Sequence, residues 1–296
     1  MDQTRLLPLL TIPAMLVIVE LAALLLSLPM QMAGIMAFED PESVANPFIF
    51  IIILLIFTAF LLLLLRFRWK KLVGIIIGLS IFFTFIYIFA GITGYFLGLT
   101  APALLLTLVL SIAATALLYL YPEWYVIDTL GILIAAGAAS IFGISLSIVP
   151  VIILLIILLV YDAISVYKTK HMITLAEGVV DMKSPILFIV PKKRGYSYRT
   201  EGIANIEGGG ERGAYIIGMG DLIMPSILVV SANVFLDTAK IGLITIPALG
   251  AMIGSVIGLS LLLMVVRKGK PQAGLPLING GAILGFLAGY GIALLL

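Results

Sequence analysis

Long apolar stretches follow one another along the whole chain, separated by shorter polar or charged segments. A helix needs roughly 20 apolar residues to cross the hydrocarbon core of a bilayer, which is about 30 Å thick. We expect membrane-spanning helices at 6–30, 46–65, 72–97, 101–121, 125–146, 148–167, 213–236, 241–266 and 276–296. The pattern therefore predicts an all-α polytopic membrane protein with about nine transmembrane helices.

One long polar segment, from Lys168 to Arg212, interrupts this pattern. We divide the chain accordingly into an N-terminal six-helix transmembrane part (1–167), a cytoplasmic loop (168–212) and a C-terminal three-helix transmembrane part (213–296). Within the loop, Ser184 to Pro191 is a short apolar run of strand-forming residues, and Glu207 to Glu211 is typical of a flexible hinge. Two interpretations stand: a plain linker, or a segment that orders by adding a β-strand to a bound substrate.

The distribution of positive charge predicts the orientation of the chain. Nine spans with a cytoplasmic N-terminus place every Lys and Arg except Lys240 on the cytoplasmic side, as the positive-inside rule requires. An error of one span in the middle would scatter these charges over both faces. We therefore expect a multi-pass integral membrane protein with an extracytoplasmic C-terminus and an acidic outer loop at Glu39 to Glu42.

Composition narrows the class of protein further. Hydrophobic residues make up 62% of the chain, charged residues only 11%, and the mean hydropathy is +1.27, which excludes a soluble globular domain and makes the lipid bilayer its solvent. A net charge of +2 gives no reason to expect nucleic acid as a partner. The first apolar run, which begins at Leu6, shows no clear cleavage site and is interpreted as a retained span.

Few side chains could carry chemistry inside the membrane. The chain has no cysteine, and its one histidine, His171, lies in the polar loop. No His-Glu-x-x-His string exists, so we expect neither a metal site nor a cofactor. The carboxylates that fall within spans remain: Glu20, Asp128, Asp162 and Asp221. Because a charge at the centre of a span costs about 2.5–3.5 kcal/mol on insertion scales, each is a candidate functional residue.

Asp162 and Asp221 stand at similar depths on consecutive spans. Asp162 lies six residues before Lys168, about 9 Å along a helix, and Asp221 lies nine residues after Arg212, about 13 Å along a helix. Two carboxyls that share a site of low dielectric cannot both ionise cheaply, so the pair supplies one acid and one base. The base would take a proton from water while the acid polarises the carbonyl of the scissile peptide.

The sequence says less about the role of the other two carboxylates, Asp128 and Glu20. Asp128 follows Glu123 closely at the cytoplasmic start of a span, so it faces the interface and is given no role. Glu20 lies deeper, where it either pairs within the helix bundle or faces a water-filled cavity.

The residues around the two acids match a known family. Tyr161-Asp162 and Gly218-Met219-Gly220-Asp221 resemble the Tyr-Asp and Gly-x-Gly-Asp motifs of presenilins, and the order of the motifs and the intervening polar loop agree as well. The resemblance, to an archaeal or microbial homologue, implies the fold shared by presenilins and signal peptide peptidases, with Asp162 and Asp221 catalytic. Gly218 and Gly220 would let backbone approach closely beside the acid. Tyr161 would either position Asp162 or pack.

The family's third motif, Pro-Ala-Leu, is less well preserved. Its literal copies, Pro102-Ala103-Leu104 and Pro247-Ala248-Leu249, stand in places that do not fit the family pattern. The positional match is Ala273-Gly274-Leu275-Pro276, after a short basic loop, and it departs from the motif at its first two residues. The resemblance implies that Gly274, Leu275 and Pro276 lie beside the two acids and shape the site or dock substrate.

The resemblance thus implies an intramembrane aspartyl endopeptidase that hydrolyses peptide bonds within transmembrane helices, with single-span membrane proteins or their remnants as substrates. It leaves open whether the chain works alone, as a homo-oligomer or with accessory subunits. The competing interpretation is a proton or cation transporter or channel that uses the same buried acids; an inactive scaffold is a third. Signal peptide peptidases, whose pattern has the opposite orientation, and prepilin peptidases, which lack the Tyr-Asp partner, fit less well.

Overall fold

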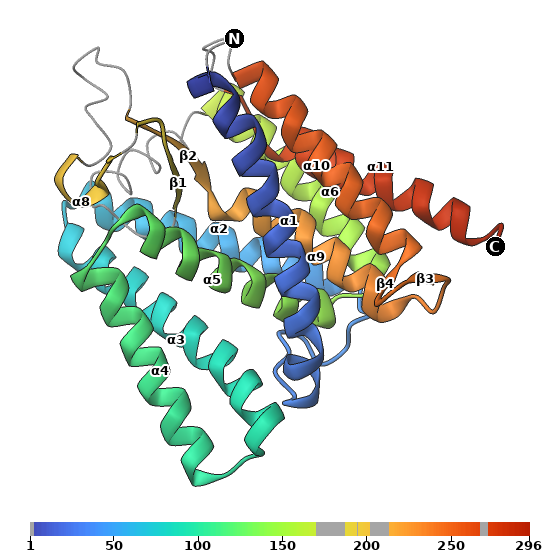
Figure 1. Ribbon diagram of the computed structural model, residues 1–296, viewed down its shortest axis with the longest axis horizontal. Helices are drawn as coiled ribbons and strands as arrows, with labels where there is room; N and C mark the ends of the chain where they lie inside the picture. Colours follow the sequence, from blue (N-terminus) through green and yellow to red (C-terminus); the bar gives the residue numbers. More distant parts are fainter. Residues whose placement is uncertain (1–2, 170–186, 194, 202–212, 267–271) are drawn as a thin grey trace.

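The computed structural model describes residues 3–169, 187–193, 195–201, 213–266 and 272–296. Its long helices are α1 (Gln3–Met32), α2 (Ala45–Arg66), α3 (Lys70–Leu97), α4 (Ala101–Leu120), α5 (Trp124–Ser145), α6 (Ile148–Ile164), α9 (Met219–Phe235), α10 (Ile246–Val266) and α11 (Leu275–Ala293). The shorter elements are the π-helical turn η1 (Ser165–Thr169), the helix α8 (Tyr198–Glu201) and the strands β1 (Leu187–Pro191), β2 (Ala214–Gly218), β3 (Lys240–Ile241) and β4 (Ile244–Thr245). Figure 1 shows how these elements are arranged.

The helices agree with the predicted fold class. Within the described ranges, 8 helices are long and apolar enough to cross a membrane. The ninth, α9, is apolar but has only 17 residues. The all-α polytopic fold with about nine transmembrane helices is therefore confirmed.

Two of the predicted spans begin too early. Residues 214–218, expected to be helical, form β2, which pairs antiparallel with β1 so that Ala214 lies opposite Pro191 and Gly218 opposite Leu187. Residues 241–245, also expected to be helical, belong with Lys240 to the β3–β4 hairpin around Gly242, whose φ is +66°. A short run of apolar residues has the same sequence pattern in a strand and in a buried helix. Whether it forms a strand depends on whether a partner strand pairs with it.

The expected strand in the polar loop is confirmed over Leu187–Pro191. The rest of the loop segments singled out from the sequence, namely residues 184–186, His171 and the hinge at 207–211, lie outside the described residues.

The short helix α9 lies at the centre of the bundle. It packs against α1, α5, α6, α10 and α11, and four consecutive residues, Ile227 to Val230, are fully buried. Consecutive residues point in different directions around a helix, so α9 is enclosed on all sides at this level. The α3–α4 pair stands to one side of this centre and the α10–α11 pair to the other (Figure 1).

Glycines bring α10 and α11 into backbone contact. Gly250, Gly254 and Gly258 of α10 face Gly281, Gly285 and Gly289 of α11. A Cβ atom added at Gly254 would overlap the carbonyl oxygen of Gly281, and one added at Gly285 would overlap that of Gly250. Small residues at a helix interface permit such contact in a membrane, where close packing supplies much of the association energy. The N-terminal end of α11 is thereby held in a defined place.

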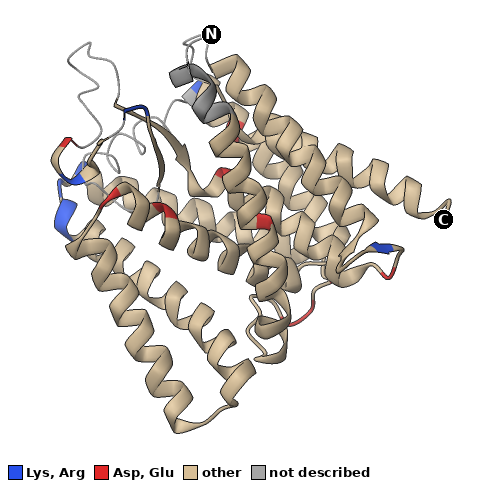
Figure 2. Ribbon diagram, viewed as in Figure 1, with Lys and Arg blue, Asp and Glu red and all other residues tan. Residues whose placement is uncertain are grey.

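Charged residues are few and unevenly placed (Figure 2). The Lys and Arg residues of the described segments gather at the end of the molecule that carries the N-terminus, β1 and α8, apart from one in β3, which is Lys240. This separation agrees with the pattern used to infer the orientation. The orientation itself stays a prediction.

Candidate active site

Asp162 lies near the end of α6 and is only 7% exposed. Its Oδ2 atom accepts a hydrogen bond of 3.0 Å from the backbone N–H of Leu275, at the N-terminus of α11. The first N–H groups of a helix have no partner inside the helix, so Asp162 satisfies one donor that α11 leaves free.

Further contacts hold α11 against α6. The Tyr167 hydroxyl oxygen accepts a hydrogen bond of 3.4 Å from the N–H of Ala273, and the Asn279 side-chain amide donates one of 3.4 Å to the carbonyl of Leu155. The segment 273–275 is thus held by two side chains, Asp162 near the end of α6 and Tyr167 in the following turn η1. Sequence analysis did not find Tyr167, and its only signal was its place five residues after Asp162.

Asp221 lies in the first turn of α9 and is half-buried. The helix-based depth inferred for it from the sequence was wrong, because the five residues before Met219 are extended. A strand rises about 3.3 Å per residue and a helix only 1.5 Å, so β2 carries the chain further than a helix of equal length would. Both acids nevertheless lie against the same short segment at the start of α11.

Gly274 and the residue after it lie against both carboxyls. A Cβ atom added to it would lie 3.3 Å from Oδ2 and 3.4 Å from Cγ of Asp221, while the next residue, Leu275, donates to Asp162. Pro276 follows within the first turn of α11. The structure therefore brings the segment 274–276 to both acids. The literal copies of the motif lie elsewhere, at the starts of α4 and α10.

The glycines before Asp221 have a different setting from the one expected. Gly218 is the extended residue that precedes α9, and a Cβ there would meet only Asp221 Oδ2, at 3.8 Å. A Cβ at Gly220 would meet nothing within 4 Å among the described atoms. Among the described residues, no backbone approaches Gly218 or Gly220 closely, so close backbone packing does not explain why glycine stands at these two positions. Tyr161, on α6 directly before Asp162, is half-buried.

Glu20 and Asp128 lie outside this pair and have specific partners. Glu20 is fully buried and accepts a hydrogen bond of 2.7 Å from the Ser255 hydroxyl of α10. Its other oxygen has no hydrogen-bond partner within the described part of the chain. Asp128 accepts a hydrogen bond of 2.8 Å from the backbone N–H of Ile189 in β1. The interpretation that Asp128 only faces the interface was therefore wrong.

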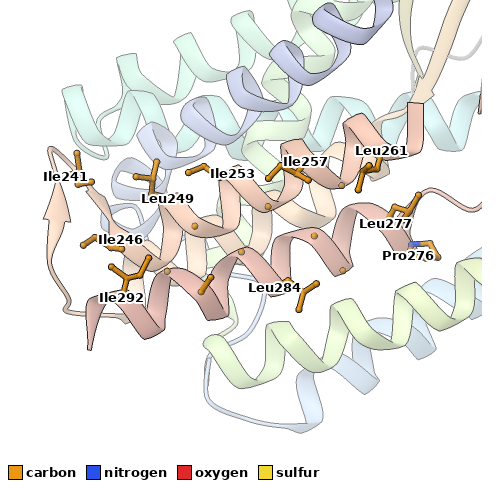
Figure 3. Close-up of a pocket in the computed structure, with 18 of the residues that line it drawn as sticks. Ile241, Ile246, Leu249, Ile253, Ile257, Leu261, Pro276, Leu277, Leu284 and Ile292 are labelled. Carbon is orange, nitrogen blue, oxygen red and sulfur yellow. The ribbon is translucent and has the colours of Figure 1, made fainter. Parts of the chain in front are cut away.

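An apolar groove of about 900 Å³ runs along α10 and α11 (Figure 3). Ile253 and Ile257 of α10 and Leu284 of α11 line its middle, and Pro276 and Leu277 stand at one end. This end directly follows Leu275, the residue that binds Asp162. The groove itself contains no acid, so it is a surface beside the candidate site and not the site.

A bundle of membrane-spanning helices with two facing carboxyls at the ends of consecutive spans has the architecture of an intramembrane aspartate protease. The model of one family, described as signal-peptide peptidase, presenilin aspartyl protease, matches residues 13–294. This chain belongs to that family and is a presenilin-type intramembrane aspartate protease, a hydrolase embedded in the membrane by several helices.

Solved structures agree. Two structures of a presenilin family intramembrane aspartate protease, in space groups C222 and P2, are 51% and 52% identical to this chain. Each match covers 97% of this chain, and it covers 100% of the first solved chain and 99% of the second. The TM-scores are 0.73 and 0.72. A search of curated proteins finds no match. The family acts on transmembrane helices within the bilayer, and the alternative of a transporter or channel finds no support in these comparisons.

Proposed function

We propose that Asp162 and Asp221 are the catalytic pair and hydrolyse peptide bonds within the transmembrane helices of single-span membrane proteins. The observation that carries this proposal is the contact of one short segment, Gly274-Leu275, with both carboxyls. The hydrogen bond from Leu275 holds the Asp162 carboxyl in one orientation, and α9 presents Asp221 from the other side. Two acids held in this way can share one proton between them.

The chemistry follows from that shared proton. The ionised carboxylate removes a proton from water, whose oxygen attacks the peptide carbonyl carbon. The protonated carboxyl donates its proton to the carbonyl oxygen, which gives a neutral tetrahedral intermediate. When this intermediate collapses, the C–N bond breaks and the leaving nitrogen takes a proton from the carboxyl that received the first one. One hydroxyl of the intermediate returns its proton to the other carboxylate, so that the products are a carboxylic acid and an amine and the pair is back in its starting state.

The site has room for a substrate backbone beside Asp221. No described atom lies within 4 Å of a Cβ added at Gly220, and β2, which runs directly into α9, pairs only with β1 among the described residues. An unwound substrate segment could therefore add to the free edge of β2 as a strand and reach the acids. A helical substrate cannot do so, because its own backbone hydrogen bonds occupy the groups that the edge would bind.

The proposal includes the orientation inferred from charge, with a cytoplasmic N-terminus, a cytoplasmic segment 168–212 and an extracytoplasmic C-terminus. The chain contains no cysteine, so single cysteines introduced at Trp69, an exposed residue between α2 and α3, or near Lys240 can be labelled without background. With the proposed orientation, a membrane-impermeant thiol reagent applied from outside labels the Lys240 site alone. Labelling of the Trp69 site alone would reverse the orientation.

The function is tested by incubating the purified protein in detergent with a purified single-span membrane protein and measuring the product masses. We expect products cut inside the transmembrane span. The same protein reconstituted in liposomes is expected to show no proton or cation flux above protein-free vesicles. Ion flux without cleavage would overturn the proposal in favour of transport.

Gly274 provides a test of the geometry between the acids. Gly274→Val is expected to lower kcat roughly 10-fold or more, because a branched side chain must displace the Asp221 carboxyl, and misplacement of a reacting group by about 1 Å can cost 100-fold. Gly274→Ala presses on that carboxyl by only a few tenths of an ångström and restores the residue of the family motif, so it serves as the tolerated control. Equal kcat values for the Val variant and wild type would remove Gly274 from the site.

A further inference from the structure

One face of α5 contacts both the strand β1 and the start of α9, the helix that carries Asp221. Asp128 and Gly131 stand one helical turn apart, and residues so spaced share a face of a helix. Asp128 binds the backbone of β1, and Gly131 lies against side chains from β1 and from the start of α9. Neither residue touches the acids of the proposed catalytic pair.

The Asp128 contact fixes the outer edge of β1. Its Oδ1 atom accepts the N–H of Ile189 at 2.8 Å, and Ile189 stands in the middle of the strand, opposite Ile216 of β2. A hydrogen bond to a carboxylate is stronger than one between neutral groups. This bond therefore attaches the sheet to α5 at one defined residue, and it covers the edge of β1 that does not face β2.

Gly131 brings the start of α9 against the same helix. A Cβ atom added at Gly131 would lie 2.6 Å from the terminal methyl of Met219 and 3.1 Å from the ring of Phe188. Met219 and Phe188 are both buried, and Met219 stands two residues before Asp221. The strand β1 and the first turn of α9, which carries Asp221, thus pack next to each other on α5.

We propose that Asp128 is a positioning residue of the protease: through its bond to Ile189 it sets the register of the β1–β2 sheet on α5, and thereby the place of Asp221. A movement of the sheet would be passed directly to Asp221, because β2 ends at Gly218 and α9 begins at Met219 with no intervening loop. A sheet displaced along α5 would move Asp221 relative to Asp162, whose own place depends on α6 and α11. This inference rests on the proposed function of the two aspartates.

The segment that follows β1 has a separate attachment to α5. Glu123 accepts hydrogen bonds from the Ser197 hydroxyl at 2.7 Å and from the Tyr198 N–H at 3.2 Å, and Tyr198 is buried. Loss of the Asp128 bond therefore leaves α8 docked on α5. The expected effect is a displacement of the β1–β2 sheet along α5 and not the unfolding of this end of the protein.

The test replaces Asp128 by Leu, which has a similar size and no acceptor, and by Asn, whose carbonyl oxygen still accepts the Ile189 N–H. With a purified single-span substrate, Asp128→Leu is expected to lower kcat roughly 10- to 100-fold and to move or spread the cleavage positions seen in product masses. Asp128→Asn is expected to restore the wild-type positions and most of kcat. Thr129→Val, which changes the next, exposed residue of α5, is the matched control.

Three results would overturn the role of Asp128. They are wild-type kcat and cleavage positions in Asp128→Leu, an Asn variant as impaired as the Leu variant, and a loss of activity that follows a lower melting temperature with cleavage positions unchanged. Failure of the proposed function would look different: in that case Asp162→Asn would still cut the substrate, whatever the Asp128 variants do.

Discussion

Asp162→Asn and Asp221→Asn are each expected to abolish cleavage of a single-span substrate while leaving the protein folded in detergent. An amide has the size of the carboxyl and can still accept the Leu275 N–H that Asp162 binds, but it neither takes nor gives a proton at neutral pH. Because the proposed mechanism needs both acids, loss of either is expected to remove the acid–base cycle. The rate is expected to fall by roughly 10⁴-fold or more, measured as product formed over time by mass spectrometry.

Asp237→Asn is the matched control for this prediction. Asp237 is an exposed carboxylate just beyond the other end of α9, so its replacement changes the charge of the protein equally and leaves the candidate site intact. It is expected to cut at the wild-type rate. Retained cutting by either of the other two variants would refute the catalytic pair.

Gly254→Ala is expected to destabilise the helix bundle strongly, although it adds only one methyl group. The new Cβ would overlap the carbonyl oxygen of Gly281 and crowd the Cα of Gly285, and both are backbone atoms that no rotamer change can move. Overpacking of this kind costs about 1–3 kcal/mol and sometimes more. The melting temperature in detergent should fall, and activity should fall with it, because α11 carries Gly274 and Leu275 at its N-terminal end.

Gly291→Ala tests whether this effect comes from the interface. Gly291 also lies in α11, but a Cβ added there meets nothing within 4 Å of the described atoms. Replacing a helical glycine by alanine favours the helix by about 1 kcal/mol, so this variant should melt at the wild-type temperature or above it. If both variants melt alike, the contact between α10 and α11 does not hold the bundle together.

The hydropathy of the chain was enough to predict the fold class and the approximate place of every long helix. Bilayer thickness prescribes the length of an apolar helix, and that constraint acts on each segment by itself, without regard to its neighbours. The same physics selected Asp162 and Asp221 for attention, because a carboxyl within a span is costly wherever it stands. The structure places both against one segment, Gly274-Leu275, and their catalytic role stays a prediction.

Contacts between segments far apart in the sequence could not be predicted in this way. Whether residues 214–218 are strand or helix depends on β1, which stands 23 residues or more before them, and the apolar pattern is the same in both states. The partner of Asp128 is a backbone N–H 61 residues away, and no side-chain pattern marks a backbone donor. Tyr167 and Gly274 owe their places to the packing of α11 on α6.

The sequence by itself therefore determined that this chain crosses the membrane about nine times and carries a carboxyl in each of two consecutive spans, because these properties follow from local hydropathy and from the cost of a charge in lipid. Only the tertiary structure decided that the segment Gly274-Leu275 lies against both carboxyls and that Asp128 holds β1 on α5. Such contacts depend on which helix faces which, and that choice is made by close packing over the whole bundle.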